Sequence, residues 1–179
     1  MIRIDSETGT QKFYQDDFKH SRWFDINAAD KMINEMEWLD EKRILIATGD
    51  GLRVFDIANE NYTKNYFRTQ NKNQGIDFPL DRNWIRNFEI IDKNNLWISA
   101  KNGIIYKANL EDEILENYTE KTDLQDYDAR QILFDKKNNQ LWVNIENTGI
   151  DILDVKTGEV NNLRDYNSTL FGREFNNII

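Results

Sequence analysis

The side chains of this sequence that are best suited to binding a small ligand stand where polar segments give way to apolar runs. Trp84 and Arg86 follow the Asn- and Gln-rich segment 69–83, and Asp128 and Arg130 stand at the next such boundary. An indole ring offers a flat apolar face on which a sugar can stack, while Arg and Asp can hydrogen bond to sugar hydroxyls. These residue types indicate a carbohydrate or another small ligand. The alternative is a solvated rim with ordinary ion pairs.

A second candidate group for ligand binding lies in the polar segment 17–32. It contains His20 and Trp23, and Arg22 lies between them in the sequence. A lone His on a polar loop is usually just exposed to solvent. This group is therefore a weaker prediction than the first, and exposure without any ligand is its alternative.

Catalytic and metal-binding patterns are missing from the sequence. It contains no Cys, which excludes thiol nucleophiles, disulfides and Cys-ligated metals. His20 is the only His, and it cannot build a His-based metal centre alone. No Ser stands in a Gly-x-Ser-x-Gly elbow, and no two carboxylates are paired as glycoside hydrolysis requires. We expect a protein that is not an enzyme and has no cofactor and no metal site.

The charge and hydropathy of the chain exclude two classes of partner. The formal net charge is −9, and the Lys and Arg residues form no basic cluster, so nucleic acid is not an expected partner. No apolar run approaches the roughly 18 residues that a membrane-spanning helix needs. The first residues alternate as a strand does and show no signal-peptide core. We therefore expect no membrane segment in this chain.

A repeated pattern must position the candidate side chains. Residues 96–104 read LWISAKNGI, residues 141–150 read LWVNIENTGI, and residues 44–52 read ILIATGDGL. Each copy is an apolar run, a turn with Gly and a second apolar run, which is typical of an antiparallel hairpin. Four short strands repeated about every 50 residues indicate a β-propeller blade. The turn glycines that mark this period are Gly51, Gly103 and Gly149.

The fold predicted from these repeats is all-β, with propeller blades of four antiparallel strands. No segment sustains the apolar spacing of an amphipathic helix over three turns, which excludes a helical solenoid. We expect a single incomplete β-propeller domain over residues 1–179. Its expected parts are a partial blade at 1–16, complete blades at 33–68, 84–118 and 129–163, and the start of a further blade at 174–179.

Two features of the repeats are expected to be structural. Trp97 and Trp142 share one position in the second strand, and Leu45 takes this position in the first copy. A large side chain there would fill the space between neighbouring blades. The turns that begin at Asp92 and Asp135 look like calcium loops, but they lack the alternating oxygen ligands and the closing Glu. Plain hairpin turns are the favoured interpretation.

The combined pattern of strand, turn and Thr-Gly resembles the two-component regulator propeller repeat. Its best copies are residues 92–104 and 135–158, and with the weaker copies the resemblance covers nearly the whole chain. Repeats of that family build seven-bladed propellers in the periplasmic sensor region of bacterial hybrid histidine kinases, often responding to glycans. The resemblance implies a periplasmic location and a sensing role, and any kinase activity would reside in a separate domain.

The leading functional prediction is a ligand-sensing module, in which binding at the propeller rim changes a contact between blades or subunits. A protein-interaction scaffold is the alternative, and a propeller lyase or hydrolase is a minor one because the fold does not exclude enzymes. An open stack of blades exposes apolar faces. We therefore expect the partners to include the remaining blades of a longer propeller or a second copy of the chain.

Overall fold

The computed structural model describes residues 2–14, 33–66, 84–124, 129–146 and 148–163. Within these ranges, every regular element except one short 3₁₀ turn is a β-strand. The strands form three four-stranded sheets and one two-stranded hairpin. The pairing of successive strands is antiparallel. The prediction of an all-β protein with four-stranded blades is confirmed.

The strands follow one another as simple meanders. The N-terminal hairpin consists of β1 (Ile2–Ile4) and β2 (Gln11–Phe13). The first blade consists of β3 (Ile33–Trp38), β4 (Arg43–Thr48), β5 (Gly51–Asp56) and β6 (Asn61–Tyr66). The second blade consists of β7 (Ile85–Ile90), β8 (Asn95–Ala100), β9 (Ile105–Asn109) and β10 (Ile114–Asn117). The third blade consists of β11 (Ala129–Asp135), β12 (Gln140–Ile145), β13 (Gly149–Asp154) and β14 (Val160–Leu163).

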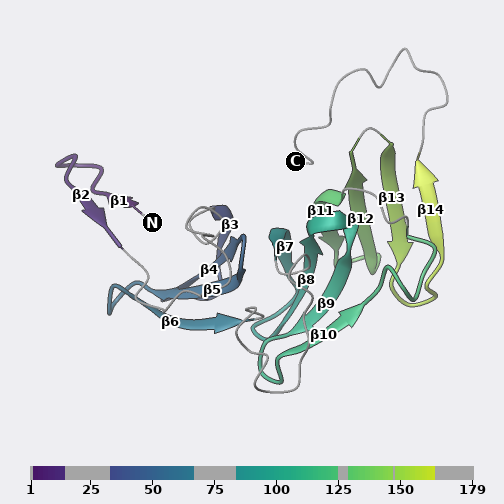
Figure 1. Ribbon diagram of the computed structural model, residues 1–179, viewed down its shortest axis with the longest axis horizontal. Helices are drawn as coiled ribbons and strands as arrows, with labels where there is room; N and C mark the ends of the chain where they lie inside the picture. The colour runs from purple at the N-terminus through teal and green to yellow at the C-terminus, as the bar shows by residue number, and fades with distance from the viewer. Residues whose placement is uncertain (1, 15–32, 67–83, 125–128, 147, 164–179) are drawn as a thin grey trace, which may run out of the picture.

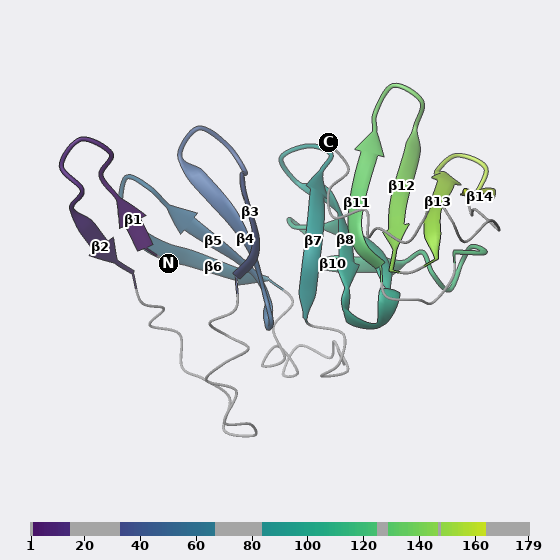
Figure 2. The ribbon, with the colours of Figure 1, turned by 90° about the horizontal axis from the view of Figure 1, so that it is seen from above.

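The three blades stand side by side in chain order, with the hairpin β1–β2 beside the first blade (Figures 1 and 2). In each blade the first strand lies at one edge of the sheet and the fourth strand at the other. The first strand of the second blade, β7, contacts both β3 and β11. The first strands therefore form the inner side of the array, as in a β-propeller.

An apolar core fills each seam between two blades. Side chains alternate between the two faces of a strand, so each blade contributes one set to the seam before it and another to the seam after it. The core between the first and second blades includes Leu45, Ala47, Leu52, Val54, Tyr66, Ile85, Phe88, Leu96, Ile98 and Tyr106. The core between the second and third blades includes Trp97, Ile105, Leu124, Ala129, Ile132, Leu141, Val143, Ile145 and Leu153.

The two repeated tryptophans lie in different surroundings. Trp97 is fully buried in the second core, where its ring packs edge-on against Tyr118 with the ring centres 4.7 Å apart. Trp142 occupies the same position of the third blade and is half-buried. Its strand neighbours Leu141 and Val143 face the second blade, so Trp142 points to the opposite face of the sheet.

An Asp side chain builds the turn between the first and second strands of each blade. The carboxylate of Asp92 accepts hydrogen bonds from the backbone N–H groups of Asn94 and Asn95, both at 2.9 Å. Asp40 and Asp135 do the same in the other blades. These are Asx turns, which replace backbone turn hydrogen bonds with side-chain ones. The hydrogen bond from the Asn94 backbone is the main cause that lowers the pKa of Asp92.

One element differs from the sequence prediction. The sequence predicts only a hairpin turn at Gly103, whereas the structure has a 3₁₀ turn at Lys101–Gly103, labelled η4, and begins β9 at Ile105. The backbone N–H of Lys101 donates to the carbonyl of Trp84 over 2.8 Å, which draws the turn towards the start of β7. The turn glycines Gly51, Gly103 and Gly149 all have positive φ angles, the region that favours glycine.

Candidate functional site

The inner strands share a β-bulge at their beginning. The register with the second strand shifts between Ile33 and Glu35, between Ile85 and Asn87, and between Ala129 and Gln131. The extra residue in the three blades is Asn34, Arg86 and Arg130, respectively. Bulges bend a strand and redirect its side chains, and they are common beside functional sites. Two of the predicted ligand-binding residues, Arg86 and Arg130, therefore occupy equivalent bulge positions.

The predicted residue Trp84 lies at the same end of the blades. It directly precedes β7 and is half-buried. The ammonium group of Lys101 lies 5.6 Å from the centre of the Trp84 ring, a cation–π distance. The backbone hydrogen bond between Lys101 and Trp84 holds the turn η4 beside the ring. The structure thus combines an aromatic face with a cation that the sequence analysis did not include in the site.

The next blade places a charged pair at the corresponding end. Arg130 forms an ion pair and hydrogen bond with Glu146, which follows β12. The start of β11 is held to the second blade because the Ser99 hydroxyl donates to the carbonyl of Ala129 over 2.7 Å. Strand β11 also contacts η4. The beginnings of the inner strands and the hairpins between second and third strands therefore share one rim of the array.

The remaining predicted site residues cannot be placed on this rim. His20, Trp23 and Asp128 lie outside the described residues. The rim as described consists of Trp84, Arg86, Lys101, Arg130 and Glu146. Chemically it offers an aromatic ring, cations and one carboxylate, which suits a ligand with hydroxyl or anionic groups.

A polar seam that the sequence analysis missed joins the inner strands of the first two blades. The Glu35 carboxylate accepts a hydrogen bond from the Asn87 side-chain amide at 2.8 Å and one from the Phe88 backbone N–H at 2.6 Å. The Asn34 side chain donates to the carbonyl of Ile85 over 2.6 Å. All of these bonds join β3 to β7, and two of them link a side chain of β3 to the main chain of β7.

The same link recurs between the second and third blades. The Asn87 side-chain oxygen accepts from the backbone N–H of Ile132 at 2.9 Å. The backbone of Phe134 also acts on the Glu89 carboxylate, where it opposes the rise in pKa that burial causes. Each inner strand is the edge strand of its sheet. An edge strand has backbone N–H groups that do not hydrogen bond to a neighbouring strand. Side chains of the preceding blade accept from these groups at Phe88 and Ile132.

The seam perturbs the acidity of its carboxyl groups. Burial raises the pKa of Glu35 to about 7, and the hydrogen bond from the Phe88 backbone opposes this shift. The negative charges of Glu37 and Glu89 act in the same direction as burial. Burial also raises the pKa of Glu37 and of Glu89, where the Lys136 ammonium opposes it. The sequence signal for this seam is a polar pair at the same place of each inner strand, read as Asn34-Glu35, Arg86-Asn87 and Arg130-Gln131.

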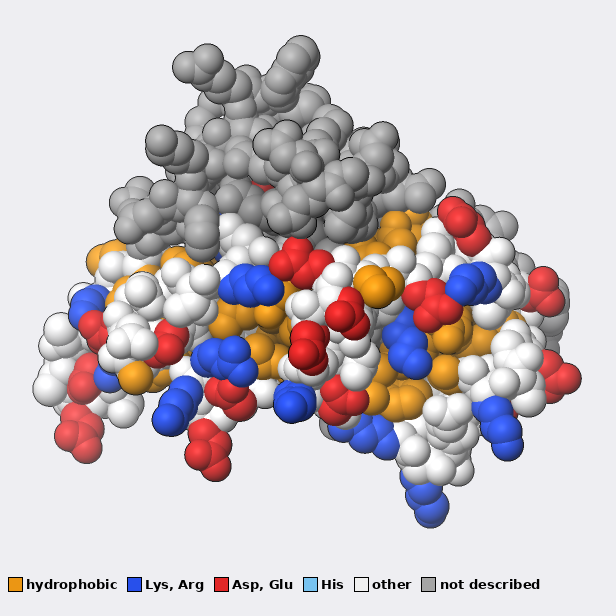
Figure 3. Space-filling view, turned by 90° about the horizontal axis from the view of Figure 1, so that it is seen from below, with side chains coloured by type: hydrophobic (Ala, Val, Ile, Leu, Met, Phe, Trp, Pro, Cys, Tyr) orange, Lys and Arg blue, Asp and Glu red, His pale blue; other side chains and the backbone are white. Residues whose placement is uncertain are grey.

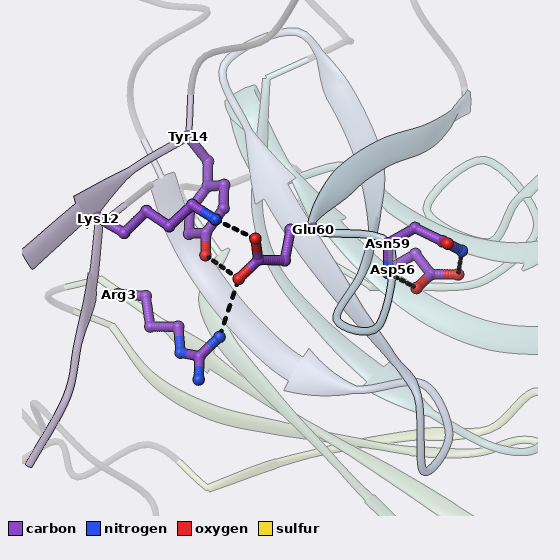
Figure 4. Close-up of polar contacts among 6 residues, drawn as sticks. All are labelled: Arg3, Lys12, Tyr14, Asp56, Asn59 and Glu60. Carbon is purple, nitrogen blue, oxygen red and sulfur yellow. Dashed lines mark hydrogen bonds and ion pairs between the residues drawn. The ribbon is translucent and has the colours of Figure 1, made fainter.

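A second polar junction joins the N-terminal hairpin to the first blade (Figure 4). The Glu60 carboxylate accepts from Arg3 at 3.1 Å and from the Tyr14 hydroxyl at 2.9 Å, and it pairs with Lys12. The hydrogen bond from Lys12 is the main cause that lowers the pKa of Glu60. A shallow cavity of about 320 Å³ lies beside these groups. Its lining also includes Asp5, Thr8 and Thr10.

Glu60 holds a backbone conformation that two other repeats give to glycine. Glu60 and Glu113 have φ angles of 52° and 55°, and the equivalent turn positions are Gly9 and Gly158. A left-handed conformation costs a residue with a side chain about 1–2 kcal/mol. Both Glu residues pair with a Lys of the preceding unit, since Lys64 lies 3.1 Å from Glu113. We read this junction as structural, because its contacts join one blade to the next.

The described residues also bear on three further features: a metal-binding cluster, a membrane-spanning helix and a basic surface. Within the ranges described above, no three His, Cys, Asp or Glu side chains are placed to hold a metal ion. No helix among the described residues is long and apolar enough to span a membrane. On the face in Figure 3, Lys and Arg side chains are interspersed with Asp and Glu instead of gathering into a basic surface.

Comparison with known proteins identifies the fold. No protein-family model and no curated protein matches the chain. Among solved structures, the chain is similar to the extracellular domain of the proposed hybrid two-component system BT3049 from B. thetaiotaomicron. The TM-score is 0.61 at 16% identity, over 91% of this chain and 20% of that chain. The extracellular domain of the proposed one-component system BT4673 from the same organism gives a TM-score of 0.60 at 19% identity, over 88% of this chain and 21% of that chain.

A third similarity is to the WD40 β-propeller domain of Doa1. Its TM-score is 0.54 at 13% identity, over 72% of this chain and 39% of that chain. At these identities the comparisons show the propeller fold. The chain spans about a fifth of the length of the two bacterial domains.

Proposed function

We propose that this chain is part of the extracytoplasmic input region of a signalling receptor and that it binds a ligand without catalysis. The observation that carries this proposal is the similarity of its blades, over 91% and 88% of the chain, to two extracellular domains of proposed signalling systems. The family resemblance of the repeats supports the same role. The described blades would then belong to one larger propeller.

The rim is the proposed ligand site, and a carbohydrate is the proposed class of ligand. Trp84 offers a ring for stacking, while Arg86 and Lys101 offer donors for hydroxyl or carboxylate groups. Arg130 and Glu146 already pair with each other, so a ligand at this point would have to compete with that pair. Binding would change the contacts between the inner strands, and an attached domain would receive that change.

The test is a fluorescence or calorimetric titration of the chain with a panel of neutral and acidic oligosaccharides. We expect saturable binding that Trp84→Ala abolishes and Trp84→Phe retains in part, because an aromatic ring is preserved. The matched control is Trp38→Ala, since Trp38 is an exposed Trp at the opposite end of an inner strand. Equal loss of binding in both alanine variants, or no binding by any sugar, would reject the rim as a carbohydrate site.

A protein-interaction role is the second candidate, and one observation favours it. Ile33, Met36 and Trp38 on β3 are 40%, 52% and 59% exposed, whereas Ile85 and Phe88 at equivalent positions of β7 are 3% and 1% exposed. The inner strand of the first blade therefore presents an apolar strip to solvent. Binding to a protein but to no sugar, lost in Met36→Glu and unaffected by Trp84→Ala, would favour this function.

A further inference from the structure

The hydrogen bonds of the inner seam have a fixed direction. A backbone N–H only donates, and an ionised carboxylate only accepts. Asn87 lies between a backbone N–H and a carboxylate. Its side-chain oxygen accepts from the N–H of Ile132, and its amide nitrogen donates to Glu35. The orientation of the Asn87 amide therefore follows from its two partners. Each of the three groups belongs to a different blade.

We propose that Glu35, Asn87 and the main chain of Ile132 form a relay through which protonation of Glu35 changes the hydrogen bonding between the second and third blades. The relay makes the contact between blades respond to pH. It does not depend on the ligand proposed for the rim, because none of its three groups is a rim residue.

Protonation acts on the relay by adding a donor where only acceptors stood. One Glu35 oxygen becomes a hydroxyl, while the Phe88 N–H and the Asn87 amide nitrogen still point at the carboxyl group as donors. One way to relieve this conflict is a rotation of the Asn87 amide, which would bring its nitrogen to face the Ile132 N–H. The other is loss of the bond to Glu35, which frees Asn87 to move. Either change weakens the bond that joins the second blade to the third.

The surroundings place this change close to neutral pH. The charged groups that act on Glu35 are Glu37 on its own strand and Glu89 on β7, and both carry negative charge. Lys136, which follows β11, acts on Glu37 and Glu89. With burial as the main cause, the pKa of Glu35 is about 7. A change from pH 8 to pH 6 would therefore protonate most of this side chain.

The test follows the side-chain carboxyl of Glu35 and the backbone amide of Ile132 by NMR from pH 5 to pH 8.5 in the 179-residue chain. We expect both signals to titrate with one midpoint near 7. In Asn87→Ala, the Glu35 step should remain and the Ile132 step should disappear, because the link between them is gone. Glu41→Gln, in the exposed turn after β3, is the matched control and should leave both steps unchanged.

Two results would overturn the relay. The first is an Ile132 amide that shows no titration step, or one whose midpoint differs from that of Glu35 in the unmodified chain. This comparison needs no variant and holds even if Asn87→Ala fails to fold. The second is an Ile132 step that persists in folded Asn87→Ala, because the effect would then reach Ile132 through space. Amide hydrogen exchange at Ile132 provides an independent readout. From pH 8 to pH 6, the protection factor of Ile132 should fall several-fold relative to that of Ile98, which lies in the core of the second blade.

Discussion

Replacing Glu35 by Gln should remove a large part of the pH dependence of stability. Gln has nearly the same shape as Glu but does not titrate. The unfolded chain has an ordinary Glu pKa of 4.5, whereas burial raises the folded pKa of Glu35 to about 7. Between these values the folded state binds more protons than the unfolded chain, so the free energy of unfolding falls as the pH rises. The stability from this group is complete below pH 4.5 and lost above pH 7.

The structure sets the size of this effect. Each unit of pKa shift corresponds to about 1.4 kcal/mol, so the whole shift of Glu35 is equivalent to about 3 kcal/mol. Between pH 5 and pH 8, and allowing for partial solvent access to the carboxyl group, we expect about 2 kcal/mol. Gln also places an amide nitrogen opposite a donor of the seam, either Asn87 or Phe88. That cost is the same at every pH and does not affect the slope.

The assay is urea unfolding followed by Trp fluorescence at pH 5 and pH 8. The unmodified chain should lose about 2 kcal/mol more than Glu35→Gln between the two conditions. Glu41→Gln is the control and should follow the unmodified chain. Below about pH 4 all three proteins should lose stability, because turn carboxyls with lowered pKa values, such as Asp92, are then protonated. An unmodified chain and Glu35→Gln with the same loss from pH 5 to pH 8 would refute the role given to burial at Glu35.

The other predictions concern the seams and the turns. Trp97→Ala should cost about 3–5 kcal/mol in chemical denaturation because it opens a cavity between two blades, and a cost no greater than that of half-buried Trp142→Ala would contradict this packing. Ser99→Ala should cost about 1 kcal/mol, since it removes the donor to a buried carbonyl at the start of the third blade; an unchanged denaturation midpoint would count against that bond. Glu113→Gly should change stability by less than about 1 kcal/mol, because relief of the left-handed conformation offsets the loss of one exposed ion pair. Glu60→Gly should release the N-terminal hairpin, seen as faster hydrogen exchange in β1–β2, and unchanged exchange there would show that its three donors do not hold the hairpin.

Much of the fold could be predicted because its signals are local. The apolar run, the turn Gly and the second apolar run identify each middle hairpin, and the strands β4, β8, β12 and β13 lie where this pattern stands. The Asp in the turn after each first strand is also a local signal, because its carboxylate accepts hydrogen bonds from backbone N–H groups only a few residues later. The 3₁₀ turn at Lys101–Gly103 was not predicted, because it depends on a hydrogen bond to Trp84, which is distant in sequence.

The candidate site was harder to predict, because its contacts join different blades. Trp84, Arg86 and Arg130 could be proposed from residue type and from their place at the start of a strand. The hairpins that carry Lys101 and Glu146 could be placed at the rim as well. Their contacts with Trp84 and Arg130 could not be predicted, because these contacts form only after folding. The seam was missed for a related reason. Glu35, taken alone, reads as an exposed charge on a strand, and only the alignment of the inner strands would have shown a polar residue at the same place in each blade.

The bonds across the seams have a consequence for how such arrays can grow. Asn34, Asn87 and Ser99 each bind the main chain of the following blade, at Ile85, Ile132 and Ala129, and Glu35 binds the main chain at Phe88. Every residue except proline offers the same main-chain groups. A duplicated or inserted blade could therefore dock without matching substitutions in the blade that receives it. Such an arrangement lets the side chains of individual blades diverge while the array keeps its seams.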